Sequence, residues 1–181
     1  MNKLFWGFFL IYFNFSLTAN GSTLQILPAW LGYLMLYLAC SELQGESELF
    51  QKPRPFCVGF AVYTGILWLL SLLNISANLG IVSWILGLLS VCLSLYVGKL
   101  IIDALANVEI RRNYDLCIAH LRNVWTLMAI CSAASHLLVI VPALALGCAT
   151  AAGFAVIFFL IALHGTRKAW QNMLYEQSKP F

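Results

Sequence analysis

The chain alternates between long apolar stretches and short polar loops, and six apolar stretches can be counted. A helix of about 20 residues crosses a hydrocarbon core of about 30 Å, and most of the stretches approach or exceed that length. Helical spacing also precedes the fifth stretch, at Tyr114, Ile118 and Leu121. The pattern predicts an all-α polytopic membrane protein with six transmembrane helices in three hairpins, at residues 3–19, 24–41, 56–74, 80–110, 114–142 and 144–168.

The polar loops differ sharply in charge. The loops around Asn20-Gly21, Asn74–Gly80 and Pro142 carry no formal charge. All 10 Lys and Arg residues and all 7 Asp and Glu residues fall on the other side, in the alternate loops, at the termini and at the ends of the helices that face them. Short loops rich in Lys and Arg stay in the cytoplasm. We therefore expect both termini to be cytoplasmic, the first stretch to be a retained crossing, and the protein to lie in the cytoplasmic (inner) cell membrane.

Composition supports a membrane class and argues against a soluble one. The chain is 62% hydrophobic and 9% charged, whereas soluble domains carry about 25% charged residues. The net charge of +3 is small and follows the loops, so it does not form the basic face that nucleic-acid binding requires. We expect one membrane domain over residues 1–181, with the lipid bilayer as its main surroundings.

The sequence offers little chemistry. The six cysteines are scattered without C-x-x-C spacing, so they are interpreted as small apolar residues and no metal site or cofactor is expected. Phosphate-binding, metalloprotease and serine-hydrolase motifs do not occur in the sequence. No acid and base groups share a depth in the predicted membrane helices. We therefore expect a protein that is not an enzyme and has no catalytic residues.

The main candidate for ligand binding is His136, near the middle of the fifth predicted crossing and flanked by Ser132 and Ser135. An ionisable group at that depth suggests a functional site. The alternative is a neutral imidazole that bonds a serine or a backbone carbonyl between helices. Asn14, inside the first predicted crossing, must also find a polar partner, either in a neighbouring helix or in a polar ligand.

Two further patterns bear on packing. Lys99 and Asp103 are four residues apart at the inner end of the fourth stretch, so they are expected to pair on one helix face. Small residues recur every four positions and allow close helix approach or self-association. These stripes are Gly147, Ala151 and Ala155; Ala149 and Gly153; Ala129 and Ala133; and Ala61 and Gly65.

The segments Leu4-Phe5-Trp6-Gly7, Asn14, Ile26-Leu27-Pro28, Gly32-Tyr33 and Ser41-Glu42-Leu43 resemble small polytopic membrane proteins of anaerobic Gram-positive bacteria. That group has no assigned activity, so the resemblance implies a lineage and no mechanism. Where those proteins often carry an acidic residue beside the proline, this chain has Gln25 and Ala29. Size and topology are also similar to the substrate-binding subunits of energy-coupling-factor vitamin transporters, but aromatic residues replace their Ala-x-x-x-Ala face on the first helix.

Two functions follow as hypotheses. The first is a non-catalytic membrane subunit or scaffold that acts through a partner, such as other membrane subunits or a second copy. The alternative is a small-molecule binder or carrier that resembles a transporter substrate-binding subunit and uses the aromatic first hairpin and His136.

Overall fold

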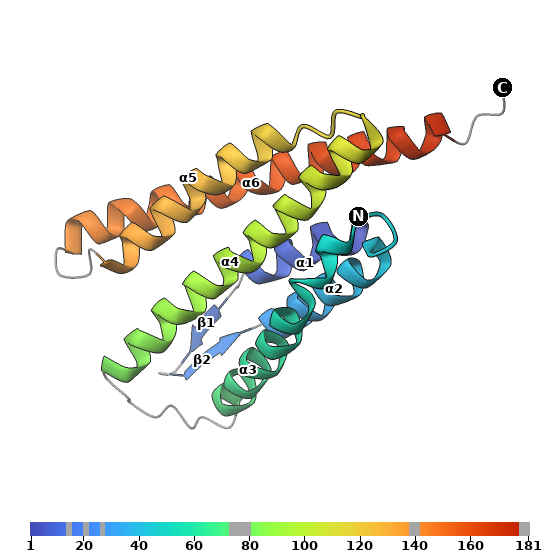
Figure 1. Cartoon of the computed structure of the whole chain (residues 1–181). Helices are drawn as coiled ribbons and strands as arrows, with labels where there is room; N and C mark the ends of the chain where they lie inside the picture. Colours follow the sequence, from blue (N-terminus) through green and yellow to red (C-terminus); the bar gives the residue numbers. More distant parts are fainter. Residues whose placement is uncertain (14–15, 20–21, 26–27, 73–80, 138–141, 178–181) are drawn as a thin grey trace. The chain divides into compact units, whose positions relative to one another are not determined.

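The computed structural model describes residues 1–13, 16–19, 22–25, 28–72, 81–137 and 142–177 (Figure 1). Only the backbone is described at residues 16–19, 22–25, 71–72, 81–86, 136–137, 142–143 and 145. Within these ranges the chain forms six α-helices, as predicted, and it divides into two compact units, Met1–Ser83 and Trp84–Phe181.

Unit 1 contains three helices: α1 (Asn2–Tyr12), α2 (Ala29–Leu43) and α3 (Arg54–Leu72), and α2 packs against both others. A short helix, η1 (Glu48–Gln51), precedes α3, and the Ser47 hydroxyl accepts a hydrogen bond from the Leu49 amide at its start. The core of this unit consists of buried apolar side chains from all four helices. They include Leu4, Phe8, Tyr33, Leu36, Ala39, Phe50, Cys57 and Phe60.

Helices α1 and α2 approach closely at two glycines. A Cβ atom placed on Gly32 would lie 2.7 Å from both the carbonyl oxygen of Gly7 and Cγ1 of Ile11. A Cβ on Gly7 would lie 2.7 Å from Cδ2 of Leu36. The two backbones therefore meet where neither helix has a side chain, which is the general use of small residues at membrane helix contacts.

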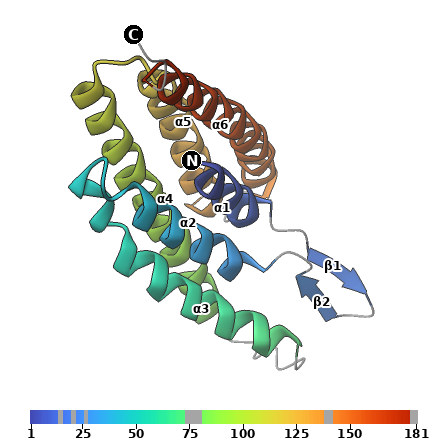
Figure 2. The same ribbon diagram turned by 90° about the vertical axis from the view of Figure 1, so that its right-hand side faces the viewer.

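Along the chain, two short antiparallel strands, β1 (Ser16–Ala19) and β2 (Ser22–Gln25), follow α1 and precede α2 (Figure 2). Their register pairs Ser16 with Gln25 and Ala19 with Ser22. This hairpin corrects the prediction that helices run to residue 19 and restart at 24. Two residues, Asn20-Gly21, separate the strands, and this dipeptide is the strongest short-range signal for a β-hairpin. From the sequence, only a turn between helices is predicted at this dipeptide.

Unit 2 contains the long helices α4 (Ile81–Arg112), α5 (Ile118–Leu137) and α6 (Pro142–Gln177), and α5 and α6 run side by side (Figures 1 and 2). The sixth helix continues to Gln177, beyond the predicted end at 168. Trp170 and Met173 in this continuation are 5% and 1% exposed, so an apolar face follows the membrane stretch. The fifth helix begins at Ile118, four residues after the predicted start.

Three helical segments are long and apolar enough to cross a membrane: Glu48–Leu70, Gly87–Arg112 and Leu146–Gln177. Large apolar side chains on them are exposed, including Val62 at 58% and Leu146 at 69%, as expected for surfaces that face lipid. α1 and α2 contain 11 and 15 residues, which correspond to about 16 and 22 Å of helix. Each is shorter than the hydrocarbon core of about 30 Å.

Candidate functional site

The predicted ligand-binding residues fall only partly within the described part of the chain. Asn14 lies outside the described residues, and at His136, in the last turn of α5, only the backbone is described. Ser132 and Ser135 lie one turn apart on α5, where the Ser135 hydroxyl donates a hydrogen bond to the Ser132 carbonyl oxygen at 2.8 Å. Such a bond is a local helix contact. The ligand site therefore stays a prediction.

The best-defined polar structure lies where α4 ends and α5 begins. The Asn113 amide donates to the Ile110 carbonyl oxygen at 3.3 Å, and the Tyr114 amide donates to the Glu109 carbonyl oxygen at 3.3 Å. Asn113 has a φ of 47°, and asparagine tolerates this left-handed conformation. These bonds form the Schellman motif that ends many helices. Arg111 and Arg112 in the last turn also suit the negative end of the helix dipole.

The carboxylate of Glu109 then organises the start of α5. Its Oε2 accepts hydrogen bonds from the amides of Leu116 at 2.9 Å and Ile118 at 3.2 Å. The first amides of a helix have no partner inside the helix, so a side chain of α4 caps α5. Leu116 and Ile118 are themselves buried. Glu109 thus joins two helices through charge-assisted bonds at a partly buried position.

A second carboxylate of α4 joins the same two helices. Arg122 on α5 donates from Nη2 to Oδ1 of Asp103 at 2.8 Å. This ion pair corrects the predicted pairing of Asp103 with Lys99, which is exposed. The physical reason is that the start of α5 lies near the C-terminal part of α4 and presents a guanidinium group, whose planar donors suit a carboxylate better than a lysine ammonium does.

Cys117 lies in this turn with a φ of 58°, a conformation that is uncommon for a residue other than glycine. Its amide donates to Oδ1 of Asp115 at 2.7 Å. Desolvation of the thiol, and then the negative charges of Asp115 and Glu109, raise the pKa of Cys117. The thiol is therefore more fully protonated near neutral pH than an ordinary exposed cysteine.

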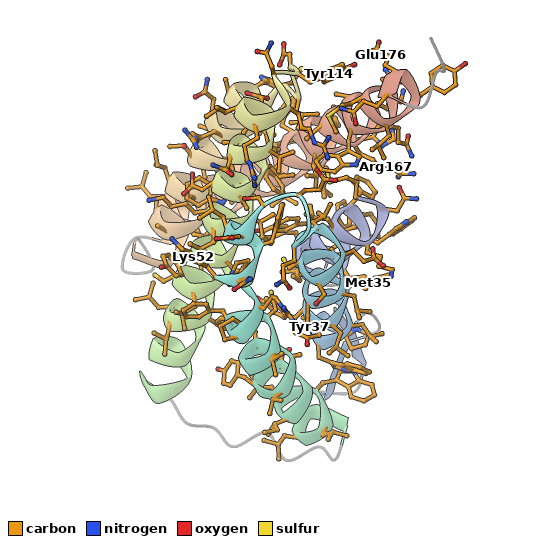
Figure 3. All side chains as sticks on the ribbon, turned by 45° about the vertical axis from the view of Figure 1, so that its right-hand side comes forward. Met35, Tyr37, Lys52, Tyr114, Arg167 and Glu176 are labelled. Carbon is orange, nitrogen blue, oxygen red and sulfur yellow. The ribbon has the colours of Figure 1, made fainter. Side chains whose placement is uncertain are left out.

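We call residues 103–122 and 164–177 the charged end of unit 2. Arg112 Nη1 donates to Gln177 Oε1 at 3.5 Å, so the ends of α4 and α6 meet there, and Tyr114 and Glu176 both lie at this end (Figure 3). Ile110 is 77% exposed and Tyr175 is 65% exposed. Large apolar side chains are thus exposed in the last turns of α4 and α6.

Unit 1 carries an open cavity of about 380 Å³ where α2 ends and α3 begins. It is lined by Tyr37, Gln44, Gln51, Arg54, Pro55 and Val58. The guanidinium of Arg54 donates to Oε1 of Gln44 at 2.7 Å and to the Tyr37 hydroxyl at 3.3 Å, and it lies 5.2 Å from the centre of the Tyr37 ring. The polar side chains are therefore held at one end of a partly apolar groove.

Neither the charged end of unit 2 nor this groove was predicted as a site. The turn near Arg111–Asn113 is predicted from the sequence, where Arg-Arg-Asn is a helix stop signal, and the structure confirms it. By contrast, nothing local connects Arg54 with Tyr37, which lies 17 residues earlier. Among the described residues, no group of three His, Cys, Asp or Glu side chains could hold a metal ion. Comparison with known proteins found no matching family model, curated relative or solved structure.

Proposed function

We propose that this chain is a non-catalytic, multi-pass subunit of the bacterial cytoplasmic membrane that acts through a partner bound at the charged end of unit 2. The observation that carries the proposal is the combination of a well-fixed turn with uncovered apolar side chains. Glu109, Asp103 and Arg122 fix the helix ends, while Ile110 and Tyr175 remain exposed. Exposed apolar side chains rimmed by polar residues are typical of protein interaction surfaces.

Helix length supports the same proposal. α4 and α6 contain 32 and 36 residues, which correspond to about 48 and 54 Å of helix, against about 30 Å for the hydrocarbon core. Each helix is therefore long enough to extend well beyond the bilayer. By the distribution of Lys and Arg, these extensions belong to the cytoplasmic side.

The partner could also be a second copy of this chain, bound along α6. Gly147, Ala149, Ala151 and Gly153 are exposed on α6, and a Cβ atom at Gly147 or Gly153 would meet nothing within 4 Å. Small exposed faces of this kind allow a second helix to approach closely. A second copy of the chain could therefore pair along α6 without closing the charged end.

The test is affinity capture of the full chain from native membranes after cross-linking, with Ile110→Asp and Tyr175→Ser as variants and Gln171→Ala as the matched control. Gln171 is exposed on α6. We expect a discrete partner with the wild type and the control, and its loss with both variants. Recovery of this chain alone at several expression levels, or capture that is indifferent to Ile110→Asp, would count against the proposal.

Orientation needs its own measurement. Cys117 is an exposed thiol that the proposal places in the cytoplasm. A membrane-impermeant maleimide should leave Cys117 unlabelled in intact cells and label it after lysis, whereas a cysteine introduced by Asn78→Cys should be labelled in intact cells. Labelling of Cys117 in intact cells would reverse the orientation and remove the cytoplasmic partner with it.

A further inference from the structure

The groove at the start of α3 holds a positive charge that the protein does not neutralise. Arg54 is paired with an amide and a phenol, Gln44 and Tyr37, and no carboxylate lies within ion-pairing distance of it in the described residues. Both neighbours fix the direction of the guanidinium without changing its charge. A planar guanidinium held in this way is suited to bind a phosphate group through parallel hydrogen bonds.

The surroundings of Arg54 add to its positive potential. Lys52 is exposed two residues earlier, and Gln51 is exposed at the rim of the groove. Lys52 and Tyr37 lie on the two segments of unit 1 that border the groove (Figure 3). The carboxylate of Glu42, on α2, forms an ion pair with Lys3 on α1, so that negative charge is already partnered. Glu46 and Glu48 lie in the segment between Gln44 and Gln51, but neither lines the groove. Of the six lining residues, Arg54 is the one that carries a formal charge, so an anion that entered the groove would meet that cation.

An apolar stripe leads away from the groove along α3. Val58 lines the groove and is 44% exposed, and it is followed at four-residue intervals by Val62, 58% exposed, and Ile66, 53% exposed. Residues four apart lie on one face of a helix, so Arg54 stands at the head of this stripe. The segment Glu48–Leu70 is also one of the three candidate membrane spans, which places the stripe against lipid tails.

We propose that this groove binds an anionic phospholipid, with the phosphate on the Arg54 guanidinium and an acyl chain along Val58, Val62 and Ile66. A phospholipid has a polar headgroup joined to apolar acyl chains. The groove presents Arg54 to the headgroup, and the stripe that follows it on α3 presents apolar side chains to an acyl chain. The cavity of about 380 Å³ has room for a headgroup. This site lies wholly in unit 1 and does not depend on the partner proposed for unit 2.

The experiment is native mass spectrometry of the full chain in detergent, titrated with phosphatidylglycerol, with phosphatidylcholine of the same acyl chains, and with inorganic phosphate. Both lipids carry the phosphate, but the choline cation of phosphatidylcholine offsets its negative charge and is repelled by Arg54. We therefore expect phosphatidylglycerol, which keeps a net negative charge, to bind at least about tenfold more tightly. Arg54→Gln should abolish that preference, and Arg54→Lys should keep part of it because lysine lacks the planar fork. Arg167→Gln, at the other unit's charged end, is the matched control.

The acyl chain is tested separately. Val62→Ser should weaken binding of long-chain phosphatidylglycerol and reduce its advantage over the short-chain lipid, while the preference for the anionic headgroup stays. If Arg54→Gln does not fold, two other measurements still test lipid binding. They are the dependence of wild-type affinity on acyl-chain length and the headgroup preference of Arg54→Lys. Equal binding of the two lipids by the wild type, or a preference that survives Arg54→Gln, overturns the proposal. Displacement of the lipid by inorganic phosphate alone would show a site for a free anion instead.

Discussion

In unit 1, α1 and α2 cross at two glycines, and an ion pair of Lys3 with Glu42 joins the same helices elsewhere along their length. In unit 2, the close contacts at the ends of α4 and α6 are made by charged side chains, and these contacts contrast with the glycine crossing. The first contact contains no side-chain polar group: Gly32 lies against the backbone of Gly7. The second depends on carboxylates, with Glu109 bonding two amides and Asp103 bonding a guanidinium. The two regions therefore use different sources of stability.

The proposed placement of α1 and α2 in lipid, and of the charged end of unit 2 in water, would account for this difference. Helix association in lipid gains little from burial of apolar surface, so close packing of backbones must supply the attraction. At an aqueous boundary, charged side chains can be partly solvated and still form directed bonds, and buried residues such as Leu105, Val108 and Leu121 add an apolar core. The first contact should accordingly be sensitive to volume and indifferent to salt. The charged contacts in unit 2 should be sensitive to salt and less sensitive to side-chain volume.

The largest expected effect is that of adding a side chain at Gly32. A Cβ there meets the Gly7 carbonyl oxygen at 2.7 Å, and a backbone atom cannot move aside cheaply. We expect Gly32→Ala to destabilise the protein by about 1–3 kcal/mol, the range for overpacking, and Gly32→Val to be worse. Thermal unfolding in detergent measures both.

Gly153→Ala is the matched control for that substitution, because nothing lies within 4 Å of a Cβ atom there. Alanine is also favoured over glycine within a helix by about 0.5–1 kcal/mol. The control should therefore be neutral or slightly stabilising. If Gly32→Ala were equally harmless, the close contact of α1 with α2 would be wrong.

The next effect concerns the cap of α5. Glu109→Ala removes the acceptor for two amides at a partly buried position, so we expect a loss of about 1–3 kcal/mol, the range for an unsatisfied buried group. Glu109→Gln retains an acceptor oxygen and should be milder. Hydrogen exchange should accelerate at Leu116 and Ile118 in the alanine variant, and unchanged exchange at those amides would contradict the cap.

Much of the helical arrangement could be predicted from hydrophobic pattern alone. Six helices were expected, and α4 differs from its predicted range by one residue at its start and two at its end. The β-hairpin of β1 and β2 was not predicted. Apolar residues such as Leu17 and Leu24 suit a strand as well as a membrane helix, and periodicity does not distinguish a strand from a helix in short apolar runs. The continuation of α6 was missed because its stripe of Trp170 and Met173 is interrupted by polar residues.

The contacts that define the candidate sites could not be predicted in the same way. Arg54 binds Gln44 and Tyr37 only because α2 and α3 fold back on each other. The small-residue stripes predicted close contacts only in part. Ala61 is buried and a Cβ atom on Gly65 would lie 3.8 Å from Trp30, whereas Gly147 and Gly153 have nothing within 4 Å and the closest approach, of Gly7 to Gly32, lies outside the predicted stripes.

A smaller effect is expected at Cys117, where the charged end alters reactivity. Because desolvation and the charges of Asp115 and Glu109 raise its pKa, removing one charge by Asp115→Asn should lower the pKa and increase the thiolate fraction. We expect alkylation by iodoacetamide near neutral pH to become a few-fold faster, roughly in proportion to that fraction. Site-resolved peptide mass spectrometry measures the rate, and the rate at Cys117 of the wild type under the same conditions serves as the reference. A rate at Cys117 that is unchanged in the variant would contradict the electrostatic cause.

The smallest effect, and the one that separates the two regions most cleanly, belongs to the ion pair of Asp103 and Arg122. Both side chains are about half exposed, at 43% and 53%, and exposed pairs contribute about 0.2–1 kcal/mol. Asp103→Asn should therefore lower the thermal stability slightly at low salt, and the loss should shrink as salt screens the pair. The effect of Gly32→Ala should not change with salt, because no charge takes part in that contact. If salt left the Asp103→Asn difference intact but altered that of Gly32→Ala, the assignment of a charge-based contact to unit 2 and a packing-based contact to unit 1 would have to be reversed.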